Sequence, residues 1–257
     1  MPERSAALVA VIPARIGSTR FPEKPLARIA GVPMITRVVE RVRASGAFDH
    51  ILVATDEERI ANAARNAGAD ARMTDSYLAN GTLRCHAALC QWEAEVGYEA
   101  TWVVNVQGDE PLIPPEVINQ VAGNLEQSAT AGVATLCEPF DSVIDFVNPN
   151  AVKVVSGASG NAHYFSRAPI PFPRDKSLGS DNSLPDEARR HIGIYAYKVA
   201  SLNQFIDWDI APLEQLESLE QLRFLANGID IHVADACVSV PGGVDTEEDL
   251  ESIINSI

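Results

Sequence analysis

The stretch Val9–Leu26, V-A-V-I-P-A-R-I-G-S-T-R-F-P-E-K-P-L, decides the interpretation of this chain. An apolar run ends at Pro13, and a segment rich in Gly, Ser, Thr and Pro follows it. This segment carries the three cations Arg15, Arg20 and Lys24. The pattern predicts a buried strand that leads into a stiff basic loop. Backbone N–H groups and fixed cations in such a loop suit a phosphate group. A surface loop with a few solubilising cations is the alternative.

The acidity of the whole chain makes this basic segment informative. The 257 residues include 20 Lys+Arg and 35 Asp+Glu, which gives a formal net charge of −15. A field of that sign repels nucleic acid and anionic membranes, so we expect neither as a partner. A cluster of cations on that background favours phosphate binding over a surface loop.

The composition is typical of a soluble globular protein. Hydrophobic residues make up 46% of the chain, and no apolar run reaches membrane-spanning length. The N-terminus shows no long apolar stretch of the kind found in secretory signals. The four cysteines form no C-x-x-C pair, which is typical of reduced thiols. We therefore expect a cytoplasmic protein.

Strand and helix patterns alternate through the first half of the chain. The predicted strands are Leu8–Ala14, Ile51–Thr55, Ala71–Met73, Trp102–Val106 and Gly132–Leu136. The predicted helices are Pro33–Ser45, Glu57–Asn66, Leu83–Val96 and Pro115–Gln127. This alternation indicates βαβ units and an α/β fold with a mostly parallel sheet. Ligands bind such sheets beyond the carboxyl ends of the strands. The basic loop, Asp56 and the segment Gln107–Glu110 all follow strands, so we expect them on one rim.

The second half of the chain is less regular. Further strands are predicted at Ala151–Val155, Ala162–Phe165, Ile192–Tyr197 and Ile229–Ala234, with a long loop at Pro169–Arg190. Helices are predicted at Pro212–Ala226 and Thr246–Ile254. Thr246 is the expected N-cap of the last helix, and Asp249 completes a capping-box pattern. No linker is evident, so residues 1–257 are interpreted as a single domain with an inserted region at about 140–225.

Two acidic residues are candidates for holding a metal ion. Asp109 follows an apolar strand, and Gly108 lets the backbone turn there. A carboxylate in this place suits Mg²⁺ bound against a nucleotide phosphate. Asp245, in the segment G-G-V-D-T-E-E-D, is the second candidate. Capping of the next turn by Asp109, or of the last helix by Asp245, is the structural alternative.

Several segments together resemble the 3-deoxy-manno-octulosonate (Kdo) cytidylyltransferase family. They follow the family's order along nearly the whole chain: I-P-A-R-I-G-S-T-R-F-P-E-K-P-L, V-A-T-D, V-N-V-Q-G-D-E-P-L-I-P, N-P-N-A-V-K-V-V, Y-F-S-R-A-P-I-P, R-H-I-G-I-Y-A-Y, L-E-S-L-E-Q-L-R and G-V-D-T-E-E-D-L. The resemblance implies a Rossmann-like nucleotide-diphospho-sugar transferase fold, with a mixed, mostly parallel sheet flanked by helices. It also implies a homodimer that uses Mg²⁺ to couple CTP to the acid sugar Kdo. The products are CMP-Kdo and pyrophosphate, for lipopolysaccharide synthesis.

The resemblance also implies roles for single residues. The residues implied to bind the nucleotide are Arg15, Arg20, Lys24, Asn80, Gly81 and Arg84, and those implied to act in catalysis are Arg15, Lys24 and Asp109. The implied Mg²⁺ ligands are Asp109 and Asp245, and the implied sugar-binding residues are Gln107, Arg167, His191 and Glu220. The fork of Arg167 suits the carboxylate of the sugar. Outside its R-H-I-G-I-Y context, His191 could equally be a core histidine.

Two segments depart from the family pattern. Glu23 replaces the glycine of P-G-K-P-L, which removes conformational freedom and adds a negative charge. Relatives read H-x-S-G-T-[DE]-R where this chain has Leu78, Asn80 and Leu83 in place of the His, Ser and acid. These departures leave open a homologue with another base or acid-sugar preference. A non-catalytic binding homologue is a further alternative, although retention of the main cations and both metal carboxylates argues against it.

Overall fold

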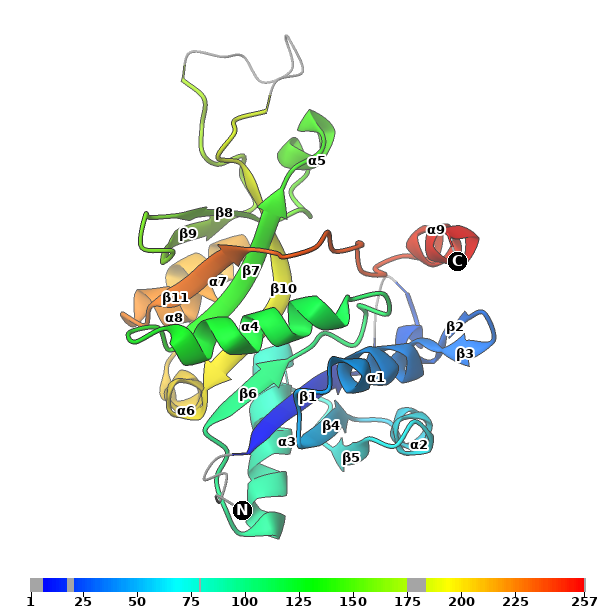
Figure 1. The fold of residues 1–257 in the computed structure, drawn as a ribbon. Helices are drawn as coiled ribbons and strands as arrows, with labels where there is room; N and C mark the ends of the chain where they lie inside the picture. Colours follow the sequence, from blue (N-terminus) through cyan, green and yellow to red (C-terminus); the bar gives the residue numbers. More distant parts are fainter. Residues whose placement is uncertain (1–6, 18–20, 79, 175–183, 257) are drawn as a thin grey trace.

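The computed structural model describes residues 7–17, 21–78, 80–174 and 184–256 of the chain. Within these residues one sheet contains nine strands, seven of them in the order β11-β7-β10-β6-β1-β4-β5 (Figure 1). Their bounds are β1 (Leu8–Ala14), β4 (His50–Thr55), β5 (Asp70–Met73), β6 (Trp102–Asn105), β7 (Val133–Pro139), β10 (Arg189–Lys198) and β11 (Ile231–Asp235). The other two, β8 (Lys153–Ser156) and β9 (Ala162–Ser166), attach through β10.

The sheet is mixed but mostly parallel, as predicted. Strand β1 pairs in parallel with β4 and β6, β4 with β5, and β11 with β7. Strand β10 runs antiparallel between β6 and β7. It belongs to the region 140–225 that was interpreted as an insertion, so part of that region lies within the main sheet.

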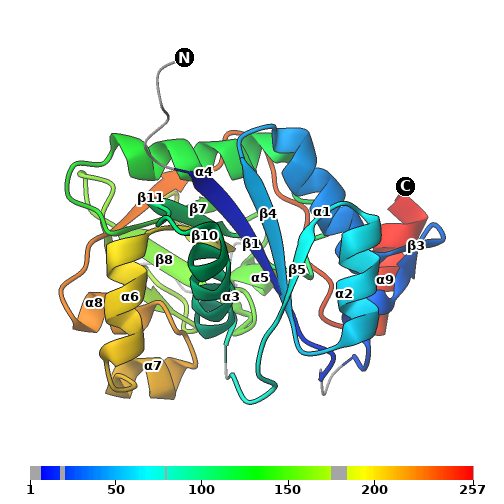
Figure 2. The same cartoon turned by 90° about the horizontal axis from the view of Figure 1, so that it is seen from below.

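Helices cover both faces of the sheet (Figure 2). On one face lie α1 (Met34–Ser45), α2 (Glu58–Asn66) and α4 (Pro115–Gln127), and on the other lie α3 (Gly81–Val96) and α6 (Val199–Asp207). Alternate residues of β1 serve the two cores: Val9 and Val11 pack toward α3, whereas Ala10 and Ile12 pack toward α1. This alternation is the two-residue period of a strand buried on both faces.

The remaining elements are short. They are the 3-10 helix η1 (Lys24–Leu26), the hairpin β2 (Arg28–Ile29) and β3 (Val32–Pro33), and the helices α5 (Val143–Val147), α7 (Pro212–Glu217), α8 (Leu222–Ala226) and α9 (Glu247–Ser256). No helix in the described ranges has the length and apolar character needed to cross a lipid bilayer.

The single helix predicted at Pro212–Ala226 is wrong. Ser218 adopts the left-handed conformation with φ of 51°, and this ends α7 before α8 begins. The carbonyls of Glu217 and Ser218 accept hydrogen bonds from the Arg167 side chain. Tertiary bonds therefore replace the helical ones at the break. The predicted loop Pro169–Arg190 is also too long, because Arg189 and Arg190 already belong to β10.

Candidate active site

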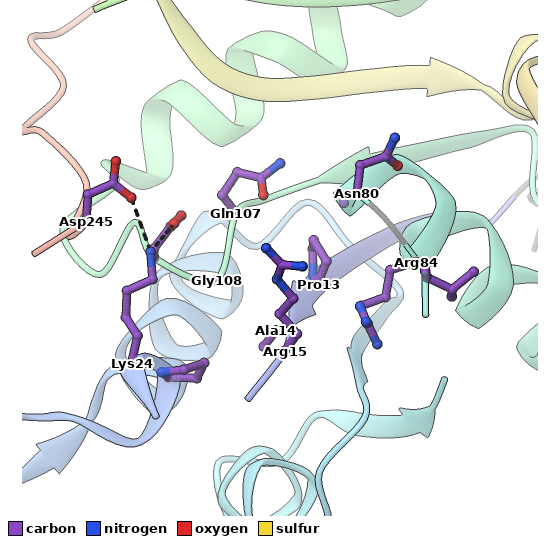
Figure 3. A pocket seen from close by; sticks show the side chains of 13 residues that line it. Pro13, Ala14, Arg15, Lys24, Asn80, Arg84, Gln107, Gly108 and Asp245 are labelled. Carbon is purple, nitrogen blue, oxygen red and sulfur yellow. Dashed lines mark hydrogen bonds and ion pairs between the residues drawn. The ribbon is translucent and has the colours of Figure 1, made fainter. Parts of the chain in front are cut away.

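A pocket lies beyond the carboxyl ends of β1 and β6, where the α/β pattern predicts a ligand site (Figure 3). The start of α3 and the segment before α9 complete its wall, and its volume is about 280 Å³. Most of the sequence-predicted site residues line it: Arg15, Lys24, Asn80, Gly81, Arg84, Gln107, Asp109 and Asp245. Arg20 lies outside the described residues.

Two loops at the floor of this pocket pack tightly on each other. The loop after β6 passes so close to β1 that a Cβ built on Gly108 would lie 2.7 Å from the carbonyl oxygen of Pro13. Only glycine fits this approach. The packing sets Asp109 and the exposed Arg15 into the same pocket, from two different strands.

The ammonium of Lys24 is the point where the two predicted metal-binding carboxylates meet (Figure 3). Its Nζ donates to Asp109 Oδ2 at 2.7 Å, to the carbonyl of Val244 at 2.8 Å and to Asp245 Oδ1 at 3.4 Å. The Lys24 side chain is only 13% exposed. An ammonium has three donor hydrogens, and these contacts use all of them.

Capping of the last helix, the alternative role for Asp245, is carried out by its neighbours Thr246 and Asp249. Asp249 Oδ2 accepts from the N–H groups of Thr246 and Asp245 at 2.8 and 2.9 Å, and Thr246 Oγ1 accepts from the N–H of Asp249 at 3.2 Å. The predicted capping box is thus confirmed. Since Asp249 and Thr246 cap α9, the Asp245 carboxylate faces Lys24 instead.

Two carboxylates that converge on one cation also suit a divalent metal ion. Mg²⁺ is usually held by one or two carboxylates together with substrate phosphates, not by a complete protein cage. Asp109 and Asp245 supply that number. Across the described ranges, no group of three or more His, Cys, Asp or Glu side chains is arranged to hold a metal. Asp109 and Asp245 fit this mode of binding, in which the remaining ligands of a Mg²⁺ ion would come from outside the protein.

Glu110 adds a further carboxyl group beside this pair. Burial, and then repulsion from Asp109, raises the pKa of Glu110 to about 8. A Cβ built on Gly243 would lie 3.0 Å from Glu110 Oε1 and 3.1 Å from the Asp109 carbonyl oxygen. The segment before α9 therefore packs closely on the loop that carries Asp109.

Arg84 forms a buried cationic wall of the pocket. Its side chain is 2% exposed and lies 3.6 Å from Asp56 Oδ2, measured from Nη2. Nη1 donates to Thr74 Oγ1 at 2.5 Å. Burial lowers the pKa of Arg84, and the charge of Asp56 opposes that change. The sequence left Arg84 without an assigned acidic partner, and the structure provides Asp56.

The start of α3 explains one of the departures from the family pattern. Asn80 is the N-cap of this helix, and its side-chain oxygen accepts from the N–H of Leu83 at 2.9 Å. Leu83 packs against the core on the α3 face of the sheet and does not line the pocket. Leu78 does line the pocket. Of the three substitutions, Leu78 and Asn80 are therefore the ones that can meet a ligand.

The structure also explains how Glu23, the other departure, is accommodated. Glu23 adopts the left-handed conformation, with φ of 56°, at the position where the family pattern P-G-K-P-L has glycine. The backbone thus keeps the conformation that glycine favours. The Glu23 carboxylate pairs with Arg59 on α2 at 2.7 Å and does not line the pocket.

The predicted sugar-binding residues separate into two groups. Gln107 lines the pocket, and its side-chain oxygen would lie 3.3 Å from a Cβ built on Gly81. The other three residues do not line it: Arg167, His191 and Glu220. They lie toward the half of the sheet that carries β8, β9 and β10.

His191 is packed among aromatic rings. Its Nε2 lies 3.0 Å from Thr135 Oγ1, and its ring centroid is 4.9 Å from that of Phe165 and 5.4 Å from that of Tyr195. Burial, and then the charge of Arg190, lowers the pKa of His191 to about 3. The imidazole is therefore neutral at physiological pH.

Arg167 is held by backbone carbonyls. Its Nε donates to Glu217 O at 2.6 Å, Nη1 to Pro149 O at 2.9 Å and Nη2 to Ser218 O at 3.2 Å. Since a guanidinium carries five N–H donors, two remain for a ligand. The contacts fix the direction of the fork.

Glu220 contacts the start of α3, next to the pocket wall. Its Oε1 accepts from Thr82 Oγ1 at 2.8 Å, and Thr82 lies next to Gly81 of the pocket. Its Oε2 is buried and has no hydrogen-bond partner among the described residues. Burial raises the pKa of Glu220. An unpaired buried carboxylate oxygen is costly, which is consistent with a ligand-binding role.

Fold and pocket together define a nucleotidyltransferase-like site, and the comparisons with known proteins agree. Residues 9–231 match the family described as Cytidylyltransferase. The chain therefore belongs to the cytidylyltransferase family.

The similar proteins within that family carry one particular name. The chain is 55% identical to a 3-deoxy-manno-octulosonate cytidylyltransferase from Cellvibrio japonicus, over 95% of both chains. It is 51% identical to the protein of the same name from Pseudomonas syringae pv. tomato, over 97% of both chains.

Solved structures give the same picture. A structure described as CMP:2-keto-3-deoxy-manno-octonic acid synthetase complexed with CTP matches 98% of both chains, with a TM-score of 0.85 and 36% identity. A 4-diphosphocytidyl-2C-methyl-D-erythritol synthase from Anaerococcus prevotii shares the fold at a TM-score of 0.62 and 11% identity. The predicted nucleotidyltransferase fold is thus confirmed.

Proposed function

We propose that this protein transfers CMP from CTP to the anomeric hydroxyl of 3-deoxy-manno-octulosonate, and releases pyrophosphate. The similarity to relatives of that name over almost the full chain supports the substrates. The observation that carries the chemistry is the convergence of Arg15, Lys24, Asp109 and Asp245 on one pocket. An inactive homologue would not need all four.

The chemistry requires one bond to form and one to break. The anomeric oxygen of the sugar attacks the α-phosphorus of CTP in line, and the bond from that phosphorus to the bridging oxygen breaks. Pyrophosphate leaves with the bridging oxygen, and the hydroxyl proton passes to solvent or to the pyrophosphate. Such a transfer depends on positioning and charge neutralisation, and needs no protein nucleophile.

The cations of the pocket neutralise the triphosphate in this proposal. Arg15 is exposed and directed into the pocket, where its fork can bind phosphate oxygens in a bidentate manner. Lys24 acts as a point charge that exchanges one or more of its present acceptors for a phosphate oxygen. We assign the cytosine base to the part of the pocket that is lined by Asn80, Gly81 and Arg84.

We assign the metal site to Asp109 and Asp245. When bound there, Mg²⁺ would act as a Lewis acid that neutralises charge on the phosphate oxygens. The two carboxylates orient that site from the loop after β6 and from the segment before α9. We assign the acid sugar to Gln107, Arg167, His191 and Glu220, with the Arg167 fork directed at its carboxylate.

The test is pyrophosphate release from CTP with and without Kdo, together with detection of CMP-Kdo by mass spectrometry. Release that requires both substrates and Mg²⁺ is the expected result. Asp109→Asn and Asp245→Asn should each lower turnover more than about 100-fold while retaining the wild-type melting temperature within a few degrees. Retained turnover in either variant would remove that residue from the metal site.

A substrate panel separates the alternatives. Leu78 lines the pocket where relatives carry histidine, so UTP and other acid sugars should be included. Faster turnover with one of these would indicate a divergent specificity, and absence of turnover with all would indicate a binding homologue.

The product would serve lipopolysaccharide assembly. A cytoplasmic homodimer is the form we expect, and sedimentation measures the oligomeric state.

A further inference from the structure

We propose that Asp56 is a positioning residue of the nucleotide site. Its single carboxylate holds both the loop that carries Arg15 and the guanidinium of Arg84. This inference rests on the proposed function, because it treats both arginines as nucleotide-binding residues. Asp56 itself does not line the pocket. It acts from behind the pocket wall.

The first contact fixes the basic loop. Asp56 follows directly after β4, and its Oδ1 accepts from the backbone N–H of Ile16 at 3.0 Å. Ile16 is the residue after Arg15. Strand β4 pairs in register with β1, which places Thr55 beside Ala14. The bond from Asp56 therefore continues the contact between the two strands for one step beyond the sheet.

The second contact holds Arg84. The other oxygen of Asp56 lies 3.6 Å from Arg84 Nη2, and the two side chains are 7% and 2% exposed. Nη1 of Arg84 donates to Thr74, whose hydroxyl donates in turn to the carbonyl of Thr55. Both ends of the guanidinium are therefore tied to the end of β4.

Arg84 still has donors to offer. Within the described part of the chain, its buried Nη2 has no hydrogen-bond partner. Asp56 balances the charge of this buried guanidinium, but not all of its N–H donors have an acceptor. Arg84 lines the pocket, and we assign its guanidinium to the nucleotide, while the buried Nη2 faces Asp56. Loss of the Asp56 charge would leave the guanidinium uncompensated, so its position would change.

The geometry predicts a selective effect on nucleotide binding. Asp56→Asn keeps an oxygen that can accept from the Ile16 N–H but removes the charge beside Arg84. We expect it to raise the KM and the dissociation constant of CTP about tenfold, and to change the KM of the acid sugar less than about twofold. Asp56→Ala removes both contacts and should weaken CTP binding further.

The matched control is Glu214→Gln. Glu214 is also a buried carboxylate paired with a buried arginine, since its oxygens accept from Arg223 at 2.6 and 2.7 Å. It does not line the pocket. The control should lower the melting temperature and leave the dissociation constant of CTP unchanged. If Asp56→Ala does not fold, the comparison of Asp56→Asn with this control carries the test.

A double-mutant cycle with Arg84→Met tests whether Asp56 acts through Arg84. Calorimetric titration with CTP is the readout, so the result does not depend on which sugar the enzyme takes. We expect Asp56→Asn to have no further effect in the Arg84→Met background. Additive effects, or a lower melting temperature with unchanged CTP affinity, would overturn the inference. Absence of turnover with intact CTP binding would instead count against the proposed function alone.

Discussion

Lys24 and Asp109 form an ion pair of 2.7 Å at the centre of the pocket. The same ammonium also reaches Asp245 at 3.4 Å. Lys24 and a Mg²⁺ ion would therefore compete for the same two carboxylates. Any nucleotide that draws Lys24 toward its phosphates would release both carboxylates for the metal.

The first prediction follows from this competition. Lys24→Met should increase the affinity of the nucleotide-free protein for Mn²⁺, used as a paramagnetic substitute, by about tenfold, because a bound cation no longer has to be displaced. The same variant should lose most of its turnover. Electron paramagnetic resonance measures free Mn²⁺ directly. An unchanged or weaker Mn²⁺ affinity in Lys24→Met would contradict the competition.

The second prediction concerns the acid sugar. Arg167→Lys should raise the KM of the sugar at least about tenfold and leave the KM of CTP nearly unchanged, because a lysine cannot reproduce a bidentate contact with a carboxylate. Steady-state kinetics with each substrate varied in turn provide the measurement. Equal changes in both KM values would show that Arg167 supports the fold around Glu217 and Ser218 rather than the sugar.

The third prediction concerns Glu23. Glu23→Gly should change the KM of CTP less than about twofold, because the carboxylate is turned toward Arg59 and the backbone already has the conformation that glycine prefers. Arg59→Ala is the matched control, since it removes the same ion pair without altering the loop. A large decrease in KM for Glu23→Gly alone would show that the negative charge is sensed by the triphosphate.

The fourth prediction concerns Leu83. Leu83→Asp should leave the preference for CTP over UTP unchanged and lower the free energy of unfolding by about 1–3 kcal/mol, because a charge would enter a partly buried apolar contact. The ratio of kcat/KM for the two nucleotides and a urea titration test both parts. A sharper preference for CTP in Leu83→Asp would show that position 83 takes part in base recognition.

The fifth prediction concerns pH. The unfolded chain protonates His191 below about pH 6.5, whereas the folded protein keeps it neutral down to a pKa of about 3. The unfolded state therefore binds more protons in this range, and stability is lost as the pH falls through it. Between pH 7 and pH 5, wild type should lose up to about 2 kcal/mol more than His191→Gln. Equal losses of unfolding free energy in urea titrations of the two proteins would show that the pKa of folded His191 is not lowered.

The sequence predicted the parts of the fold that depend on local pattern. The strand Leu8–Ala14 and the helix Pro115–Gln127 match the structure to the residue, because apolar periodicity and proline punctuation are local signals. The break at Ser218 was missed, since the leucines on either side continue one helical face. The bonds that Ser218 and Glu217 make to Arg167 come from a distant segment, which no local pattern records. The helix Val199–Asp207 was also missed.

In the candidate site, too, local motifs were predictable and contacts between distant segments were not. The strand ends indicated Arg15, Gln107 and Asp109, because each follows a strand whose carboxyl end meets the pocket. The other predicted lining residues lie in η1, at the start of α3 and before α9, and were indicated by the motifs of the family resemblance. The role of Asp56 was not predicted beyond its place on the rim. Its V-A-T-D segment marks a strand end, but nothing in the sequence pairs it with Arg84, twenty-eight positions later. Only the register of β4 beside β1 and the packing of α3 bring the two together.

The close approach of Gly108 to the carbonyl of Pro13 limits which side chains this protein tolerates at position 108. No larger side chain fits at position 108, so the backbone turn that presents Asp109 and the one that presents Arg15 are packed as a single unit. A substitution that separated them would move the proposed phosphate-binding and metal-binding groups together. Leu78 and Asn80 line the same pocket from another segment of the chain, so a substitution at either position leaves that junction in place. One crowded glycine thus ties the orientation of Asp109 to that of Arg15.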